Sequence, residues 1–233
     1  MNLYDEPKFF EAYAQMSRSQ YGLEGAGEWH QLEPLFPKLT GKHVLDLGCG
    51  YGWHCRYAAE HGAAAVLGID QSRKMIEEAR KRNDRDGVTY RVCDLTEYEY
   101  PEESFDLVVS NLVLHYIADL DAVYRNVYQT LKPGGVFLFN IEHPTFTAGV
   151  GQQFSADGFW PVDDYYYPGP RQTDFLGHRV TKQHHTLTQI LMGLIGCGFR
   201  LEAVIEAMPP EEWREQMPDE MRRPMMLLIK AKK

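Results

Sequence analysis

The sequence lacks any long apolar run. None of its 233 residues lies in a stretch near the ~20 apolar residues that a membrane-spanning helix needs. The first residues, MNLYDEPKFFEAYAQ, also lack the basic start and apolar core of a signal peptide. Both absences argue against a membrane partner and predict a cytoplasmic protein. The length suits a single domain over residues 1–233.

Cysteine is scarce, and its spacing is irregular. The four cysteines are Cys49, Cys55, Cys93 and Cys197. They form no C-x-x-C pair, whereas zinc sites and disulfide frameworks need closer or more regular spacing. Histidine offers no better site, because His184 and His185 are adjacent and would face opposite sides of a strand. We therefore expect reduced thiols and no metal.

Positive charge is also in short supply. The formal net charge is -9, and the one dense basic run, residues 73–82, is interrupted by Glu77 and Glu78. Nucleic-acid binding needs a basic face that displaces counterions from phosphates. The run instead suits a solvated helix face with pairs such as Glu77 to Lys81. The composition predicts a small-molecule partner and no nucleic acid, and it leaves the oligomeric state open.

The chain does contain a regular alternation of strand and helix patterns. Short apolar runs at 43–47, 65–69, 88–92, 105–110 and 136–141 predict strands, and amphipathic patterns at 53–61, from 72 onward and at 119–131 predict helices. Lys132 to Gly135 should form a turn. After a helix that begins with a capping box at Thr186 and Gln189, strands are expected at 199–207 and 224–231. This order indicates an α/β fold with a mostly parallel sheet and helices on both faces.

Two segments depart from this alternation. The pattern over residues 1–40 predicts helices, with a break near residues 21–27, that form an N-terminal cover. Residues 143–185 are rich in aromatic residues, Gly and Pro, and they are too long for a plain loop, which predicts a substrate lid. Its aromatic side chains would line an apolar acceptor pocket or pack the lid onto the sheet. Arg171 or Arg179 would read an acidic group of the acceptor.

The residues 44–52, VLDLGCGYG, form a glycine loop directly after a buried strand. Glycine lets the backbone turn sharply and lets a ligand approach it closely. Asp70 ends the next strand about 20 residues later, where it suits the two hydroxyls of a ribose, and Asp94 ends the third strand within reach of an adenine. Both lie where open parallel sheets bind their ligands.

The loop favours a methyl donor over a dinucleotide. The dinucleotide pattern G-x-G-x-x-G needs glycine at position 53, which is Trp53 here. Asp46, two residues before Gly48, would be poorly placed beside a pyrophosphate but suits an ammonium group. A nicotinamide-dependent oxidoreductase is therefore the weaker alternative. A non-catalytic S-adenosylmethionine-binding regulatory protein is the other.

Five motifs in order carry a family resemblance: VLDLGCGYG, LGIDQS, VCDL, FDLVVSNLVLHYI and LKPGGVFLF. Across residues 41–141 the chain resembles the class I S-adenosylmethionine-dependent methyltransferases, in particular the small-molecule branch similar to ubiquinone/menaquinone C-methyltransferases. The resemblance implies a Rossmann-like sheet of seven strands whose last strand is antiparallel, with a lid insertion after strand 5. It also implies S-adenosyl-L-methionine as cofactor and S-adenosyl-L-homocysteine as product.

The same resemblance assigns residues to each part of the cofactor. They are Asp46, Gly48, Cys49 and Gly50 at the methionine portion, Asp70 at the ribose, Gln71 and Met75 beside the adenosine, Asp94 and Leu95 at the adenine, Asn111 beneath the sulfonium, and Tyr13 and Arg18 in the cover.

Two histidines follow strands at the expected ligand end of the sheet. His115 comes after the fourth strand and His143 after the fifth, so either is a candidate catalytic base for an acceptor that must lose a proton. The alternatives are structural: His115 would orient the cofactor loop, and His143 would cap the strand end.

Overall fold

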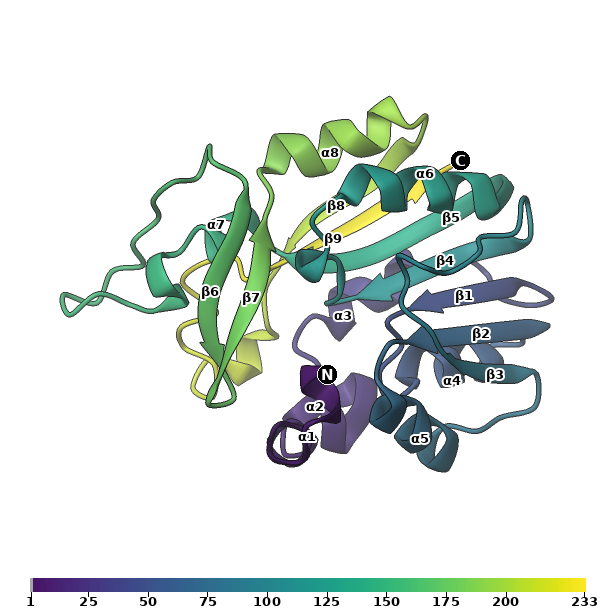
Figure 1. Cartoon of the computed structure of the whole chain (residues 1–233), viewed down its shortest axis with the longest axis horizontal. Coiled ribbons are helices and arrows are strands. Elements are labelled where there is room, and N and C mark those ends of the chain that lie inside the picture. The colour runs from purple at the N-terminus through teal and green to yellow at the C-terminus, as the bar shows by residue number, and fades with distance from the viewer. Residues whose placement is uncertain (1) are drawn as a thin grey trace.

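A computed structural model describes residues 2–233 and contains the predicted α/β fold (Figure 1). A seven-stranded sheet has the order β3-β2-β1-β4-β5-β9-β8. The strands are β1 (His43–Leu47), β2 (Ala65–Asp70), β3 (Val88–Val92), β4 (Phe105–Asn111), β5 (Leu131–Glu142), β8 (Arg200–Ala207) and β9 (Met226–Lys232). β9 is antiparallel to both of its neighbours, and the pairs among β1 to β5 are parallel. The prediction of an antiparallel last strand is confirmed.

Helices cover both faces of the sheet, as predicted. They are α4 (Trp53–Glu60), α5 (Arg73–Arg82), α6 (Leu120–Thr130) and α8 (Leu187–Gly196). Successive strand residues point to opposite faces, so β1 sends Leu45 and Leu47 into one core and Val44 into the other. The first core packs against α6 and α8, and the second packs against α4 and α5.

The turn predicted at 132–135 lies within the range of β5. The pairing of β5 with β4 shifts from Phe105↔Leu131 to Leu107↔Val136, so the residues between form an irregularity in the strand. Pro133 has no N–H to donate, and Gly134 has a φ of 76°. These residues therefore keep the predicted bend while the strand continues on either side of it.

The remaining segments gather at the end of the sheet to which the parallel strands point (Figure 1). The N-terminal cover contains η1 (Leu3–Asp5), α1 (Pro7–Ala14), α2 (Ser17–Tyr21), η2 (Gly22–Gly25), α3 (Trp29–Leu32) and η3 (Glu33–Leu35). The 143–185 segment contains α7 (Pro144–Thr147), η5 (Val150–Gln152) and a hairpin of β6 (Gly169–Phe175) and β7 (His178–His184). Two short helices complete the chain, η4 (Leu114–Tyr116) and η6 (Glu211–Trp213). Within residues 2–233, no helix combines the length and the apolar character needed to cross a membrane.

The predicted capping box at the start of α8 is present. The Thr186 side chain accepts a hydrogen bond from the Gln189 N–H, and the Gln189 side chain accepts one from the Thr186 N–H. We expect Thr186→Ala to lower the free energy of unfolding by about 1 kcal/mol, measured by urea denaturation. The control is Thr188→Ala, because Thr188 is exposed and caps nothing. Equal effects of the two substitutions would contradict the capping role.

Candidate active site

The glycine loop after β1 is a backbone structure that other residues do not readily adopt. Gly48, Gly50 and Gly52 all have positive φ, at 72°, 52° and 79°. A Cβ on Gly48 would lie 2.3 Å from Val113, and a Cβ on Gly52 would lie 2.4 Å from the Tyr90 hydroxyl. A Cβ on Gly50 would meet nothing within 4 Å, so it would stand in open space. Two glycines thus permit packing, and the middle one leaves room for a ligand.

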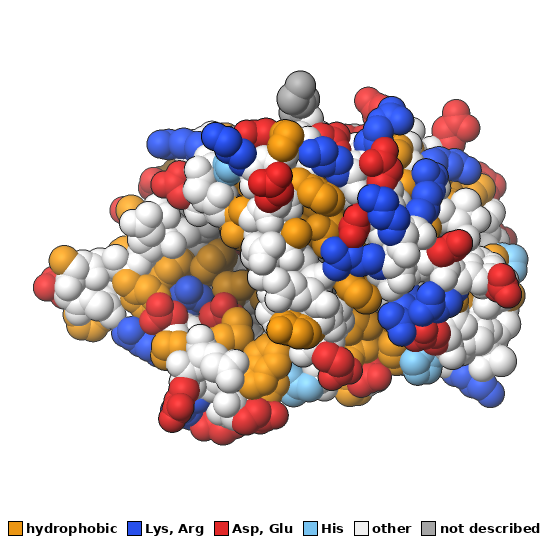
Figure 2. All heavy atoms as spheres, turned by 90° about the horizontal axis from the view of Figure 1, so that it is seen from below, with side chains coloured by type: hydrophobic (Ala, Val, Ile, Leu, Met, Phe, Trp, Pro, Cys, Tyr) orange, Lys and Arg blue, Asp and Glu red, His pale blue; other side chains and the backbone are white. Residues whose placement is uncertain are grey.

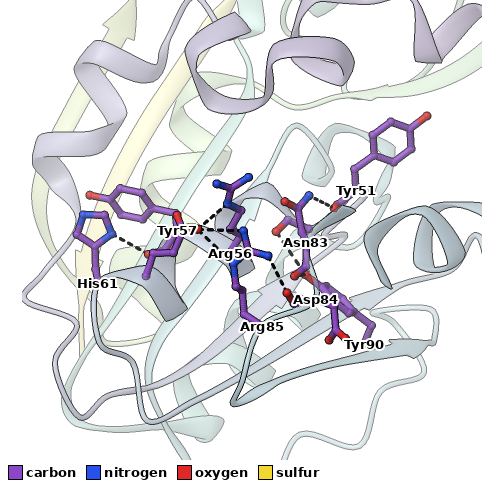
Figure 3. Close-up of polar contacts among 10 residues, drawn as sticks. Tyr51, Arg56, Tyr57, His61, Asn83, Asp84, Arg85 and Tyr90 are labelled. Carbon is purple, nitrogen blue, oxygen red and sulfur yellow. Dashed lines mark hydrogen bonds and ion pairs between the residues drawn. The ribbon is translucent and has the colours of Figure 1, made fainter. Parts of the chain in front are cut away.

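Buried polar contacts hold the loop from behind (Figure 3). Asn83 Nδ2 donates to the Tyr51 carbonyl at 2.7 Å, and the Tyr90 hydroxyl donates to the Asn83 carbonyl at 2.9 Å. Asn83 is the residue that ends α5, and Tyr90 lies on β3. The loop is therefore anchored to α5 and β3. Both elements are neighbours of β2, which ends at Asp70.

Asp70 connects the end of β2 to the loop. Its carboxylate accepts hydrogen bonds from the Gly50 N–H at 3.0 Å and from the Ser72 N–H at 2.8 Å. Burial raises the pKa of Asp70 to about 6, although both backbone hydrogen bonds oppose the rise. Asp94, at the end of β3, accepts hydrogen bonds from the Thr96 N–H and hydroxyl at 2.8 and 2.7 Å.

A cavity of about 530 Å³ lies between the carboxyl ends of the strands and the N-terminal cover. Eleven of the twelve predicted cofactor residues line it: Tyr13, Arg18, Gly48, Cys49, Gly50, Asp70, Gln71, Met75, Asp94, Leu95 and Asn111. These residues lie at or just after the ends of β1 to β4, in the first turn of α5, and in α1 and α2. The parallel sheet brings them together because the carboxyl ends of its strands share one edge.

Asp46 is the residue of that set that does not line the cavity. It is buried behind the loop, where Cys55 Sγ donates to its Oδ2 at 3.3 Å, and its Oδ1 has no hydrogen-bond partner. The strand alternation explains this position, because Asp46 points to the same face as Val44, toward α4. Burial raises the pKa of Asp46 to about 7, with the Asp70 charge adding to the rise and the Cys55 hydrogen bond opposing it. Its expected direct contact with the cofactor's ammonium group is not supported by this geometry.

Neither predicted catalytic histidine lines the cavity. His143 caps α7, since its Nδ1 accepts a hydrogen bond from the Thr145 N–H at 3.1 Å, and its Nε2 lies 2.9 Å from Glu206 Oε1. His143 therefore caps a helix, whereas the structural alternative predicted from sequence was a cap on the strand end. His115 is buried with its Nε2 3.8 Å from Glu142 Oε1, and burial lowers the pKa of His115 to about 4. A catalytic role for either histidine stays a prediction.

A chain of buried polar groups joins the cover to the sheet beside the cavity. Glu28 forms a bidentate ion pair with Arg18, through Nη1–Oε1 at 3.0 Å and Nη2–Oε2 at 3.2 Å. Asn140 Nδ2 lies within hydrogen-bonding distance of Glu28 Oε1 at 3.3 Å and of Asn111 Oδ1 at 3.0 Å. Burial disfavours the charge on Glu28, but Arg18 outweighs it and holds the pKa of Glu28 below its usual value. Sequence reasoning missed Glu28 and Asn140, because no local pattern shows that residues so far apart meet.

Tyrosines close the cavity near the end of β4. The hydroxyls of Tyr4 and Tyr116 lie 3.1 Å apart, and the rings of Tyr4 and Tyr13 meet edge to face at 5.6 Å. Burial is the largest cause that raises the pKa of all three, so their hydroxyls stay protonated at neutral pH. Tyr116 follows His115 in the quoted FDLVVSNLVLHYI motif, but only the fold shows that its side chain, not that of His115, reaches the cavity.

Known proteins with this arrangement agree on its class. The family described as "Methyltransferase domain" matches residues 45–139. The crystal structure of an S-adenosylmethionine-dependent methyltransferase from Mesorhizobium loti is 42% identical, with a TM-score of 0.83, over 91% of this chain and 100% of that one. The chain belongs to the S-adenosylmethionine-dependent methyltransferases. The predicted likeness to quinone C-methyltransferases stays a prediction.

Two further relatives extend the comparison of this methyltransferase. A candidate S-adenosylmethionine-dependent methyltransferase of Listeria monocytogenes is 45% identical, with a TM-score of 0.85, over 91% of this chain and 99% of that one. Phosphoethanolamine N-methyltransferase 3 of Arabidopsis thaliana is 39% identical over 50% of this chain and 24% of that protein. The match therefore spans about a quarter of the Arabidopsis protein's length.

The residues present fit S-adenosylmethionine, the cofactor of this family. The open space at Gly50 lets a ligand approach the backbone, and the Asp70 carboxylate at the rim suits a pair of hydroxyls. Met75 and Leu95 supply apolar walls where the resemblance places the adenosine. The cofactor is therefore S-adenosylmethionine, and its contact with the glycine loop stays a prediction.

Proposed function

We propose that this methyltransferase moves a methyl group from S-adenosylmethionine to a small organic acceptor. The observation that carries the proposal is the covered cavity of about 530 Å³, in which eleven predicted cofactor residues converge beneath the N-terminal helices. A cavity of this size, partly open to solvent, suits a metabolite. The bulk net charge of -9 also disfavours a nucleic-acid acceptor.

In this proposal the chain's residues bind, orient and exclude water. Asp70 accepts hydrogen bonds from the ribose hydroxyls, Asp94 and Leu95 contact the adenine, and the glycine loop supports the methionine portion. When bound, the cofactor supplies an already activated methyl group on its sulfonium. The protein must then align the acceptor with this methyl group. We place the acceptor on the side of the cavity that Asn111 and Tyr116 line.

The proposal retains the 143–185 segment as the substrate lid and residues 1–40 as the cofactor cover, within one domain. Both His115 and His143 lie outside the cavity lining, so a catalytic role for either needs an acceptor that reaches beyond that lining. Loss of methyl transfer in His115→Gln, with S-adenosylmethionine binding intact, would support such a role, and unchanged transfer would contradict it. We place the enzyme in the cytoplasm, where its four free thiols stay reduced.

Calorimetric titration followed by a transfer assay tests the proposed function. We expect S-adenosylmethionine to bind in the micromolar range, NAD not to compete, and labelled methyl to enter a fraction of a metabolite extract. Binding weaker than about 1 mM, worth only ~4 kcal/mol, would contradict the proposal. Tight binding with no transfer to any fraction would favour the non-catalytic regulatory protein instead.

A further inference from the structure

Two nitrogens of the Arg223 guanidinium are buried, and neither donates a hydrogen bond. Arg223 lies in the segment between β8 and β9, and its Nε and Nη1 have no hydrogen-bond partner among residues 2–233. Glu220, Asp219 and Glu142 are close enough to influence it electrostatically, yet none accepts a hydrogen bond from either nitrogen. Donors on a charged group that are withdrawn from water are costly when unpaired, so such a group is explained by a ligand that it binds.

Aromatic rings of the lid hold this guanidinium in place. Its carbon lies 4.1 Å from the ring centroid of Trp160, 4.8 Å from that of Phe146 and 5.5 Å from that of Phe154. The Phe146 and Trp160 rings are themselves stacked, 5.2 Å apart and inclined by 8°. Cation–π contact uses the face of the guanidinium and satisfies none of its N–H groups. The clamp therefore fixes the side chain while Nε and Nη1 stay without a hydrogen-bond partner.

Arg223 does not itself line the cofactor cavity, but Glu220 relates it to residues that do. Glu220 interacts electrostatically with Arg223 and also with Arg18 and Glu28. Glu28 lines the cofactor cavity and, together with Glu220 and Met226, a small second pocket. On the face seen in Figure 2, hydrophobic side chains line a hollow beside which basic and acidic side chains lie. To contact Arg223, an acceptor would have to extend from the cavity beyond Glu28 in the direction of Glu220.

Of the three Lys and Arg side chains of the lid, two are already occupied. Lys182 Nζ pairs with Glu142 and also contacts Gln152 Oε1 at 3.4 Å. Arg171, predicted from sequence to read an acidic group, donates instead to the carbonyls of Asp164 and Tyr167 at 3.1 and 2.7 Å, so it shapes the lid. The remaining sequence candidate, Arg179, is exposed on β7.

We propose that Arg223 binds a carboxylate or phosphate group of the methyl acceptor. This inference rests on the proposed function and names its substrate class as an anionic metabolite. The planar fork of arginine matches the two oxygens of either anion, and the low polarity around the aromatic clamp strengthens the contact. The lid thus contributes to specificity through the rings that orient Arg223.

Fluorine NMR of the full chain labelled with 5-fluorotryptophan and saturated with S-adenosylmethionine tests the site. We expect inorganic phosphate or acetate to shift the Trp160 resonance, assigned with Trp160→Phe, to saturation, whereas chloride at equal ionic strength does not. Arg223→Gln should weaken this binding at least tenfold, and Arg223→Lys, which retains charge without the fork, should weaken it less. The control is Arg214→Gln, because the exposed Arg214 pairs with Glu211 away from the clamp rings; it should titrate like the wild type. The separate phosphate and acetate arms identify the anion.

Two results of this titration would overturn the inference. They are the absence of a saturable shift with both anions in the wild type, and equal titration of Arg223→Gln and the wild type. Bound S-adenosylmethionine in each variant shows that the variant is folded.

A transfer assay on a fractionated extract separates this inference from the proposed function. Labelled methyl should enter compounds retained by an anion exchanger, and Arg223→Gln should raise the KM for the purified acceptor at least tenfold with little change in kcat. Label that enters only compounds without an anionic group overturns the inference and leaves the function intact. Label that enters no compound contradicts the function, while the phosphate and acetate titrations still decide whether Arg223 binds anions.

Discussion

Replacing Asp70 with alanine is expected to weaken S-adenosylmethionine binding by about 100-fold at pH 7.5. The carboxylate lines the cavity and accepts hydrogen bonds from the Gly50 and Ser72 N–H groups, so the substitution removes a ribose acceptor and loosens the glycine loop. Hydrogen bonds to a charged group are worth about 1.5–3 kcal/mol each, and about 2.7 kcal/mol corresponds to this change in affinity.

Calorimetry measures the effect, and Asp86→Asn is the matched control because Asp86 is exposed. The control should bind like the wild type. If Asp70→Ala weakens the affinity for S-adenosylmethionine by less than about threefold, Asp70 does not hold the ribose. A tenfold change in affinity corresponds to ~1.4 kcal/mol.

The affinity for S-adenosylmethionine should also fall as the pH is lowered from 7.5 to 5. Burial raises the pKa of Asp70 to about 6 in the free protein, and hydroxyl donors favour its ionised form, so binding lowers that pKa. A group that must lose a proton to bind weakens the complex below its free pKa, by about tenfold per pH unit. Burial also raises the pKa of Asp46 to about 7, and the positive charge of the cofactor lowers it, so protonation of Asp46 likewise weakens binding at low pH.

Two other groups have pKa values outside the range from pH 5 to 7.5. His54 also lines the cavity, but burial lowers its pKa to about 4. The α-amino group of the cofactor titrates near 7.7–8.0, about the upper end of the range. We expect Asp70→Asn to reduce the pH dependence, measured by calorimetry, and to leave the part that Asp46 contributes. An affinity independent of pH in the wild type would contradict the assignment.

Replacing Glu28 with alanine is expected to lower the free energy of unfolding by about 3–5 kcal/mol. The substitution leaves the charge of Arg18 unpaired next to the cavity, because both of its hydrogen bonds to Glu28 are lost. It also removes a hydrogen-bond acceptor of Asn140. Urea denaturation measures the loss, and Glu24→Ala is the matched control because Glu24 is exposed in the same cover.

A double substitution separates a lost partner from a lost contact. Arg18→Met combined with Glu28→Leu removes both charges and retains apolar volume, so it should recover much of the stability that Glu28→Ala loses. Its cofactor affinity tests whether the ion pair also positions Arg18 at the cavity. A loss below about 1 kcal/mol in Glu28→Ala would mean that the pair contributes little to the fold.

Features with local causes were readable from the sequence. Apolar runs and helix periods set the order of the elements, and the capping box at Thr186 depends on residues three apart. The glycine loop and Asp70 were also predictable, because parallel strands end at one edge and bring their terminal residues together. Family membership and the cofactor followed from those residues.

Other features of the site were decided only by tertiary packing. The direction of Asp46 depends on which face of β1 meets α4, and the placement of His115 and His143 depends on how β4 and β5 meet the lid. The contact of Asn140 with Glu28 and the clamp of Trp160 on Arg223 join residues far apart in the chain.

The physical reason for this division is the range of the forces involved. Periodicity, turn chemistry and capping act over a few residues, so a sequence displays them directly. Contacts between distant segments form only when the whole core packs, and their donors and acceptors carry no local signal. By itself, the sequence determined the sheet, the glycine loop and the methyl donor, while the tertiary structure decided which side chains enclose the cavity and which arginine is free for an acceptor.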